Sequence, residues 1–173
     1  LQPKVFVMEN VSGMVKGKMK LVFADILREL KASGYQVSAR LLNAMYFGVP
    51  QSRERMIFVG VRNDLGKAPS HPQAWSMPVG ARRIDEHPAK YSHKRYGDTL
   101  QKEGKYVGTI SKIGRKFWNE QTEFGPLSYQ YCGSFPFSYS FIGDMQNVKD
   151  RIGNSVPPLF MRSIALHIRR EIL

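Results

Sequence analysis

The sequence Val-Phe-Val-Met-Glu at residues 5–9 decides the fold class, because an uninterrupted apolar run leads directly into an acidic residue. Four apolar residues without alternation are typical of a strand covered on both faces, as in a parallel α/β sheet. Ligands of such sheets bind at the carboxyl ends of the strands. Glu9 stands at that end, and we therefore predict that it faces a ligand.

The chain continues this α/β pattern up to residue 61. Apolar residues at steps of three and four predict a helix from about Lys18 to Ser33, with Gly34 at its end. Residues 35–42 alternate between apolar and polar side chains, which predicts a half-buried strand. Residues 55–61 form the next predicted strand, and the short connection favours an antiparallel pair. We expect the second half of a Rossmann-like sheet.

A second polar group lies just before that last strand, where residues 51–55 read Gln-Ser-Arg-Glu-Arg. Together with Glu9, its two arginines can bring one carboxyl group and two guanidinium groups to a polar, planar target. The alternative is a cluster of ion pairs at the strand edge. The position of Glu9 at a neighbouring strand end favours the functional interpretation.

The composition indicates a polyanionic partner. The 173 residues carry 26 Lys and Arg against 14 Asp and Glu, a net charge of +12, and such a charge favours nucleic acid over a merely solvated basic surface. The single cysteine excludes an intrachain disulfide, and the four histidines do not form zinc-ligand spacings with it. No apolar run approaches the length of a membrane span.

The middle and the end of the chain differ in character. Basic doublets alternate with aromatic residues between residues 63 and 118, which suits contact with phosphates and bases. The aromatic residues of 117–141 are interpreted as core, and Cys132 lies among them. Gly-Asn-Ser-Val-Pro-Pro at 153–158 precedes a helix whose predicted buried face is Met161, Ile164, Ala165, Ile168 and Ile172.

Three of these motifs together resemble a known family. Glu-Asn-Val at 9–11, Gln-Ser-Arg-Glu-Arg at 51–55 and Gly-Asn-Ser-Val-Pro-Pro at 153–158 resemble motifs VI, VIII and X of the DNA cytosine-5 methyltransferases. The resemblance covers residues 1–62 and about 126–173, and it includes part of motif IX.

The resemblance implies a partial Rossmann-like, S-adenosylmethionine-dependent methyltransferase sheet with a small, basic, loop-rich target-recognition domain. Residues 1–62 would be the C-terminal half of the catalytic domain, and 63–125 the target-recognition domain. Residues 126–173 would hold the motif IX remnant and the motif X helix that returns to the catalytic domain.

The resemblance also implies roles for single residues. Glu9 would contact N3 of a flipped cytosine, Arg55 would contact O2, and Arg53 would orient the site or a phosphate. Asn154, Ser155 and Val156 would line the cofactor pocket, although the Asn-Ser pair also suits a helix cap. The residues expected on the DNA face are Gln51, Arg82, Arg83, Lys94, Arg95, Arg115 and Lys116.

Two family motifs do not occur in the sequence. It contains no Pro-Cys dipeptide for the nucleophile, since Cys132 lies in Tyr-Cys-Gly, and no glycine-rich strand-to-helix turn. We therefore expect the C-terminal half of an enzyme, as a cloned fragment, one subunit of a split enzyme or a relic. Alone it would be inactive, and it would self-associate or bind an N-terminal half.

The expected parent activity is cytosine-5 methylation of double-stranded DNA in a bacterial restriction-modification system, in the cytoplasm. Two alternatives stay open at this point. One is a non-catalytic DNA-binding or regulatory module with a methyltransferase-like fold. The other is a tRNA cytosine methyltransferase, against which the large basic middle region argues mildly.

Overall fold

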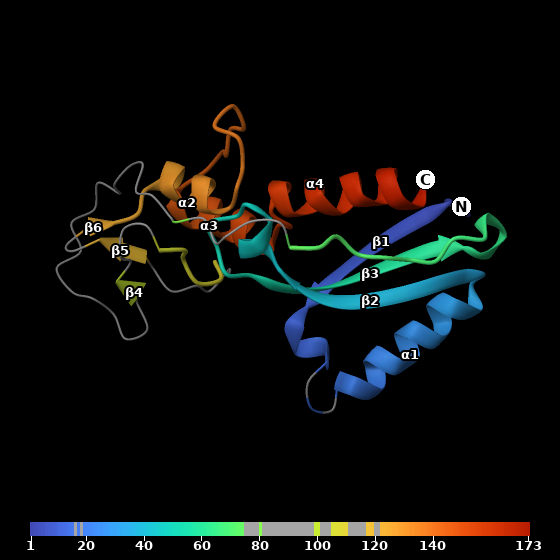
Figure 1. Ribbon diagram of the computed structural model, residues 1–173. Coiled ribbons are helices and arrows are strands. Elements are labelled where there is room, and N and C mark those ends of the chain that lie inside the picture. The colour runs from blue at the N-terminus through green and yellow to red at the C-terminus, as the bar shows by residue number, and fades with distance from the viewer. Residues whose placement is uncertain are drawn as a thin grey trace. The chain divides into compact units, whose positions relative to one another are not determined.

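The computed structural model forms two compact units (Figure 1). Unit 1 contains residues 1–43, 54–73 and 163–173, and unit 2 contains residues 44–53 and 74–162. The structure describes residues 1–15, 17, 19–74, 80, 99–100, 105–110, 117–119 and 122–173.

Unit 1 is built on a three-stranded sheet. Its strands are β1 (Val5–Val11), β2 (Tyr35–Asn43) and β3 (Glu54–Arg62), and their order in the sheet is β1-β3-β2. Both outer strands run antiparallel to β3. The antiparallel pairing predicted for the strands on either side of the short connection is therefore confirmed.

The structure corrects the prediction for the first strand. Residues 5–10 are only partly buried, β1 has the antiparallel neighbour β3, and the strand continues past Glu9 to Val11. The strand covered on both faces is β3, whose residues 56–61 are all buried. An apolar run indicates that a strand packs against other residues. It does not determine how many neighbouring strands it has or whether they run parallel to it, because those depend on the rest of the sheet.

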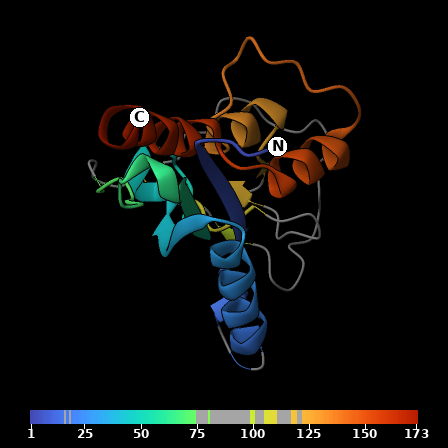
Figure 2. The same ribbon diagram turned by 90° about the vertical axis from the view of Figure 1, so that its right-hand side faces the viewer.

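Helix α1 (Met19–Ala32) covers one face of this sheet, after the short 3₁₀ turn η1 (Ser12–Val15) (Figures 1 and 2). The predicted apolar face does pack there: Phe23, Ile26, Leu27 and Leu30 lie against the cluster that includes Phe58. Two further apolar residues of the helix, Met19 and Val22, are exposed. Gly34 adopts a positive φ of 93° just after the helix, as predicted for a helix end.

The opposite face of the sheet is covered by the end of α4 (Pro158–His167) and the π-helical turn η4 (Ile168–Ile172) (Figures 1 and 2). Ile164, Ile168 and Ile172 are buried at a spacing of four. Ala165, predicted in the buried face, is exposed. The helix begins at Pro158, so the predicted helix does follow the motif at 153–158, and the last proline of the motif is its first residue.

Unit 2 is loop-rich, with short elements around its own core. They are η2 (Ala44–Phe47), β4 (Thr99–Leu100), β5 (Phe117–Asn119), β6 (Thr122–Glu123), α2 (Pro126–Cys132) and α3 (Met145–Asn154). The core consists of Val107, Ile110, Phe124, Tyr129, Cys132, Val148 and Ile152. The aromatic stretch therefore supplies core residues as predicted, although Phe137 and Tyr139 are exposed.

Helix α3 is an element that the sequence analysis did not predict. Asp144 caps its N-terminus, because its Oδ1 accepts a hydrogen bond of 2.8 Å from the Asn147 N–H. That hydrogen bond lowers the pKa of the Asp144 carboxyl group below its ordinary value. Across the described parts of both units, no helix has the length and apolarity needed to cross a membrane.

Candidate active site

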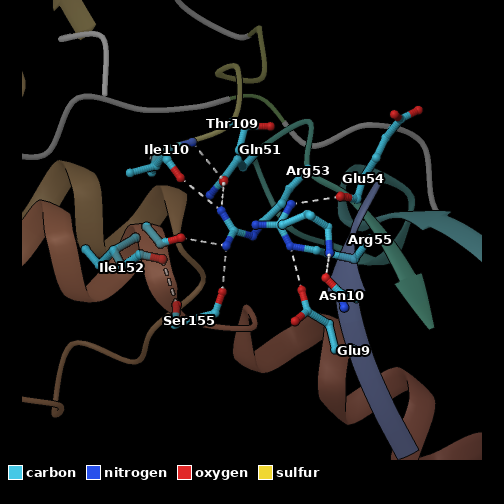
Figure 3. Close-up of polar contacts among 12 residues, drawn as sticks. Glu9, Asn10, Gln51, Arg53, Glu54, Arg55, Thr109, Ile110, Ile152 and Ser155 are labelled. Carbon is cyan, nitrogen blue, oxygen red and sulfur yellow. Dashed lines mark hydrogen bonds and ion pairs between the residues drawn. The ribbon is translucent and has the colours of Figure 1, made fainter. Parts of the chain in front are cut away.

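Glu9 and Arg55 form an ion pair on one face of the unit 1 sheet (Figure 3). In the register of β1 and β3, Glu9 lies opposite Ile57 and Val11 lies opposite Arg55. Side chains alternate along a strand, so Glu9 and Arg55 are diagonal neighbours on the same face. Their long side chains meet with a distance of 2.5 Å between Arg55 Nε and Glu9 Oε1.

This pair is shielded but still reachable by a ligand. The side chain of Arg55 is 11% exposed and that of Glu9 is 26% exposed. Arg55 Nη1 also donates to the Glu54 carbonyl oxygen at 2.8 Å, which fixes one end of the guanidinium group. A carboxyl group beside a held guanidinium group can recognise a planar ring that presents an oxygen next to a nitrogen.

Arg53 lies only two residues away in the sequence, but its surroundings are different. It precedes β3, belongs to unit 2 and is 2% exposed. Its Nη1 donates to the Ile110 carbonyl oxygen at 2.9 Å, and its Nη2 donates to the carbonyl oxygens of Gly153 at 2.7 Å and Ser155 at 2.9 Å (Figure 3). A guanidinium group enclosed in this way does not fit the phosphate contact that was one of its two predicted roles.

Gln51 is likewise an internal residue. It is 1% exposed, its Oε1 accepts from the Ile110 N–H at 3.1 Å, and its Nε2 donates to the Cys132 carbonyl oxygen at 3.2 Å. The expectation that Gln51 lies on the DNA face is therefore wrong. The amide is directed inward because residues 50–52 pair with the strand-like segment around Val107, which leaves the Gln51 side chain facing the core.

The proposed cofactor residues lie at the end of α3. Asn154 is the last residue of that helix and is exposed, whereas Ser155 and Val156 are half-buried. Ser155 caps the helix C-terminus, because its N–H and its Oγ–H donate to the Ile152 carbonyl oxygen at 3.2 and 2.8 Å. The helix-cap alternative thus holds for Ser155, but at the end of α3 and not at the start of α4.

Cys132 is not suited to nucleophilic chemistry. It is 1% exposed, and its burial raises the pKa of the thiol to about 12, whereas the reactive species is the thiolate. Its neighbours in the sequence, Tyr131 and Gly133, already argued against a nucleophile, and its burial leads to the same conclusion. Within the described ranges, no cluster of His, Cys, Asp and Glu residues could hold a metal ion.

The basic doublets expected to bind DNA lie outside the described residues. They are Arg82, Arg83, Lys94, Arg95, Arg115 and Lys116.

The residues that the sequence analysis missed are those that hold Arg53 in place. They are Ile110, through its carbonyl oxygen, and the end of α3 at Gly153. A signal for α3 is present in the sequence: an Asp at position 144 is followed by Met145, Val148 and Ile152 at steps of three and four. No pattern of residues marks Ile110, because its contribution comes from the backbone.

Comparison with known proteins decides the family. The family model of the C-5 cytosine-specific DNA methylases matches residues 1–130. The chain belongs to this family. The predicted resemblance to the cytosine-5 methyltransferases is thereby confirmed.

Among curated relatives of this DNA methylase chain, type II methyltransferase M.BspRI of Lysinibacillus sphaericus is 51% identical over 73 residues. That match covers 42% of this chain and 17% of M.BspRI. Type II methyltransferase M.NgoFVII of Neisseria gonorrhoeae is 28% identical over 209 residues, covering 91% of this chain and 56% of that protein. The chain thus spans only part of the length of the relatives it matches.

The fold of this DNA methylase chain also has solved counterparts. A crystal structure described as a DNA modification methyltransferase encoded within an E. coli prophage matches with a TM-score of 0.80 and 16% sequence identity. The match covers 99% of this chain and 70% of that chain. The partial Rossmann-like methyltransferase fold is therefore confirmed.

Proposed function

We propose that this chain is the C-terminal part of an S-adenosylmethionine-dependent enzyme that methylates carbon 5 of cytosine in double-stranded DNA. The observation that carries the proposal is the ion pair between Glu9 and Arg55, 2.5 Å apart on one sheet face and open to a ligand on the Glu9 side. Family membership supports it independently.

The chemistry explains why these two residue types are needed. Carbon 5 of cytosine is a poor nucleophile until a thiolate adds at carbon 6, and negative charge then develops at N3 and O2 of the ring. A carboxyl group at N3 and a guanidinium group at O2 stabilise that charge. In its protonated form Glu9 takes the first role and donates its proton to N3, while Arg55 donates hydrogen bonds to O2. The cytosine reaches them after leaving the base stack.

The cofactor would be held by Asn154, Ser155 and Val156. This stretch fits a ligand with polar and apolar parts, because the exposed amide of Asn154 adjoins two half-buried residues. S-adenosylmethionine supplies the methyl group that the activated ring accepts. The nucleophilic thiolate would come from outside residues 1–173, since Cys132 is buried and burial raises the pKa of its thiol to about 12.

The proposed domain assignment follows the resemblance. Residues 1–62 belong to the catalytic domain, 63–125 to target recognition, and 126–173 to the motif IX and X region. The net charge of +12 supports a role of the middle region in DNA binding. A bacterial restriction-modification system in the cytoplasm is the proposed setting, in keeping with the type II relatives.

We further propose that the N-terminal half of the catalytic domain binds beside β1, with self-association of this chain as the competing outcome. Of the strands that the structure describes, β1 is an edge strand of its sheet, and its apolar residues 5–8 are only partly buried. Such an edge pairs readily with another strand. A compact monomer at all concentrations in analytical ultracentrifugation, with no binding of an N-terminal half, would contradict this.

The test is transfer of a tritiated methyl group from S-adenosylmethionine to mixed-sequence duplex DNA. The chain is assayed alone and with a separately expressed N-terminal half that carries the Pro-Cys and glycine-rich motifs. We expect activity only in the mixture, and its loss with Glu9→Gln. Glu29→Gln is the matched control, because Glu29 lies exposed on α1. DNA binding without methyl transfer in any mixture would instead favour a non-catalytic DNA-binding module.

A further inference from the structure

Arg53 occupies a place that neither base binding nor DNA binding explains. It is 2% exposed, so it does not touch a substrate, and it spans two separate stretches of unit 2 backbone. We infer that Arg53, supported by Gln51, is a positioning residue that fixes the cofactor-binding segment, residues 154–156, from the inside. This inference rests on the cofactor role proposed above.

The contacts of one nitrogen show how the segment is held. The carbonyl groups in the last turn of a helix have no partners within the helix, and they must find other donors. At the end of α3, Ser155 Oγ–H donates a hydrogen bond to the Ile152 carbonyl oxygen. Arg53 Nη2 donates hydrogen bonds to the carbonyl oxygens of Gly153 and Ser155, at 2.7 and 2.9 Å. Hydrogen bonds therefore hold the backbone in place on both sides of Asn154. Asn154 itself is exposed.

The other nitrogen anchors the guanidinium group to the core. Arg53 Nη1 donates to the Ile110 carbonyl oxygen at 2.9 Å, and the Gln51 Oε1 lies 3.5 Å from the same nitrogen. Gln51 Oε1 also accepts from the Ile110 N–H, and the Gln51 amide nitrogen reaches the Cys132 carbonyl oxygen. The guanidinium group thus connects the end of α3 to a core segment whose own position is set by Gln51 (Figure 3).

This geometry requires arginine and not merely a positive charge. A guanidinium group is planar and holds its N–H donors at fixed angles. Nη1 and Nη2 can therefore donate hydrogen bonds to carbonyl groups in two directions at the same time. The ammonium group of lysine is a compact point charge on a flexible stem. Lysine would keep the charge but would not hold both backbone segments together.

The first experiment measures the segment directly in the purified chain. Hydrogen–deuterium exchange of the amides of residues 154–156 is followed in the unsubstituted chain, in Arg53→Lys and in Arg53→Ala. Arg151→Ala is the control, because Arg151 is an exposed arginine on α3. We expect exchange in this segment to rise by about tenfold in Arg53→Lys, the equivalent of one lost hydrogen bond to a charged group, and not to change in Arg151→Ala.

The second experiment separates positioning from general stability. In the chain mixed with the N-terminal half, Arg53→Lys should raise KM for S-adenosylmethionine by about tenfold while kcat and KM for DNA stay within a factor of about two. Addition of methylguanidinium to Arg53→Ala should restore slow exchange at residues 154–156, whereas methylammonium should not. If Arg53→Ala is poorly folded on its own, the comparison of methylguanidinium with methylammonium still tests whether a guanidinium group is required.

Two results would overturn the inference. One is unchanged exchange at residues 154–156 in a folded Arg53→Lys chain. The other is a fall in kcat with KM for S-adenosylmethionine unchanged, which would place Arg53 in the chemical step. Failure of the proposed function is recognised separately, because it appears as absence of methyl transfer in the unsubstituted mixture.

Discussion

The ion pair between Glu9 and Arg55 should also stabilise unit 1 measurably, in addition to its proposed role with the base. The perturbation is a double-mutant cycle with Glu9→Gln, Arg55→Met and the combined variant, which isolates the coupling between the two side chains. Hydrogen bonds to charged groups contribute about 1.5 to 3 kcal/mol. Since Glu9 is 26% exposed, solvent screening places the expected coupling at the lower end, at about 1.5 kcal/mol.

The assay is urea unfolding followed by circular dichroism, together with thermal melting. For a chain of this length, a coupling of about 1.5 kcal/mol corresponds to about 3 to 6 °C in Tm. Asp25→Asn is the matched control, because Asp25 and Arg28 form an exposed pair on α1 of the same unit, and exposed pairs contribute about 0.2 to 1 kcal/mol. A coupling of about 0.5 kcal/mol lies within the range of an exposed pair. A Glu9–Arg55 coupling no larger than this would show that the two side chains do not form a shielded ion pair.

Three further predictions concern packing, reactivity and pH. Gly60→Ala should destabilise the chain by about 1 to 2 kcal/mol in urea unfolding, because a Cβ at Gly60 would lie 2.0 Å from the Phe6 ring, whereas Gly13→Ala, which has open space, should not. Cys132 should resist iodoacetamide in the native chain at pH 8 and react in 8 M urea, because burial raises its thiol pKa to about 12; alkylation at equal rates in both conditions would contradict this. Burial lowers the pKa of His71 in the folded chain, so the unfolded chain binds a proton at this residue more readily. The free energy of unfolding should therefore fall as the pH drops below about 6.5, the ordinary pKa of histidine. A His71→Gln variant should lose this part of the pH dependence, and an unchanged profile would show that His71 is not its source.

The pairing of Glu9 with Arg55 was largely predictable from the sequence. Both residues belong to apolar strands, the connection between the last two strands is short, and the alternation of side chains limits which faces they can share. These are local properties, and they determine most of unit 1. The exception is the environment of β1, which depends on strands and helices that are distant in the sequence.

The separate role of Arg53 was not predictable, because the motif presents two arginines two residues apart and gives no sign that they differ. What distinguishes them is the turn before β3, which directs Arg53 into unit 2. Its carbonyl partners at Ile110 and Gly153 lie 57 and 100 residues away in the sequence. Backbone carbonyl acceptors are present at every residue, so the sequence does not reveal which of them Arg53 contacts. The burial of Arg53 among such acceptors is visible only in the folded chain.

The proposed roles of Glu9 and Arg55 at the cytosine ring can be tested by nucleoside analysis. Duplex DNA is incubated with S-adenosylmethionine, this chain and the N-terminal half, and its nucleosides are identified by mass spectrometry. We expect 5-methyldeoxycytidine with the unsubstituted chain and with Glu29→Gln, and none with Glu9→Gln. Methylation at an exocyclic amino group, or 5-methyldeoxycytidine formed equally well by Glu9→Gln, would contradict the assignment of Glu9 and Arg55 to the cytosine ring.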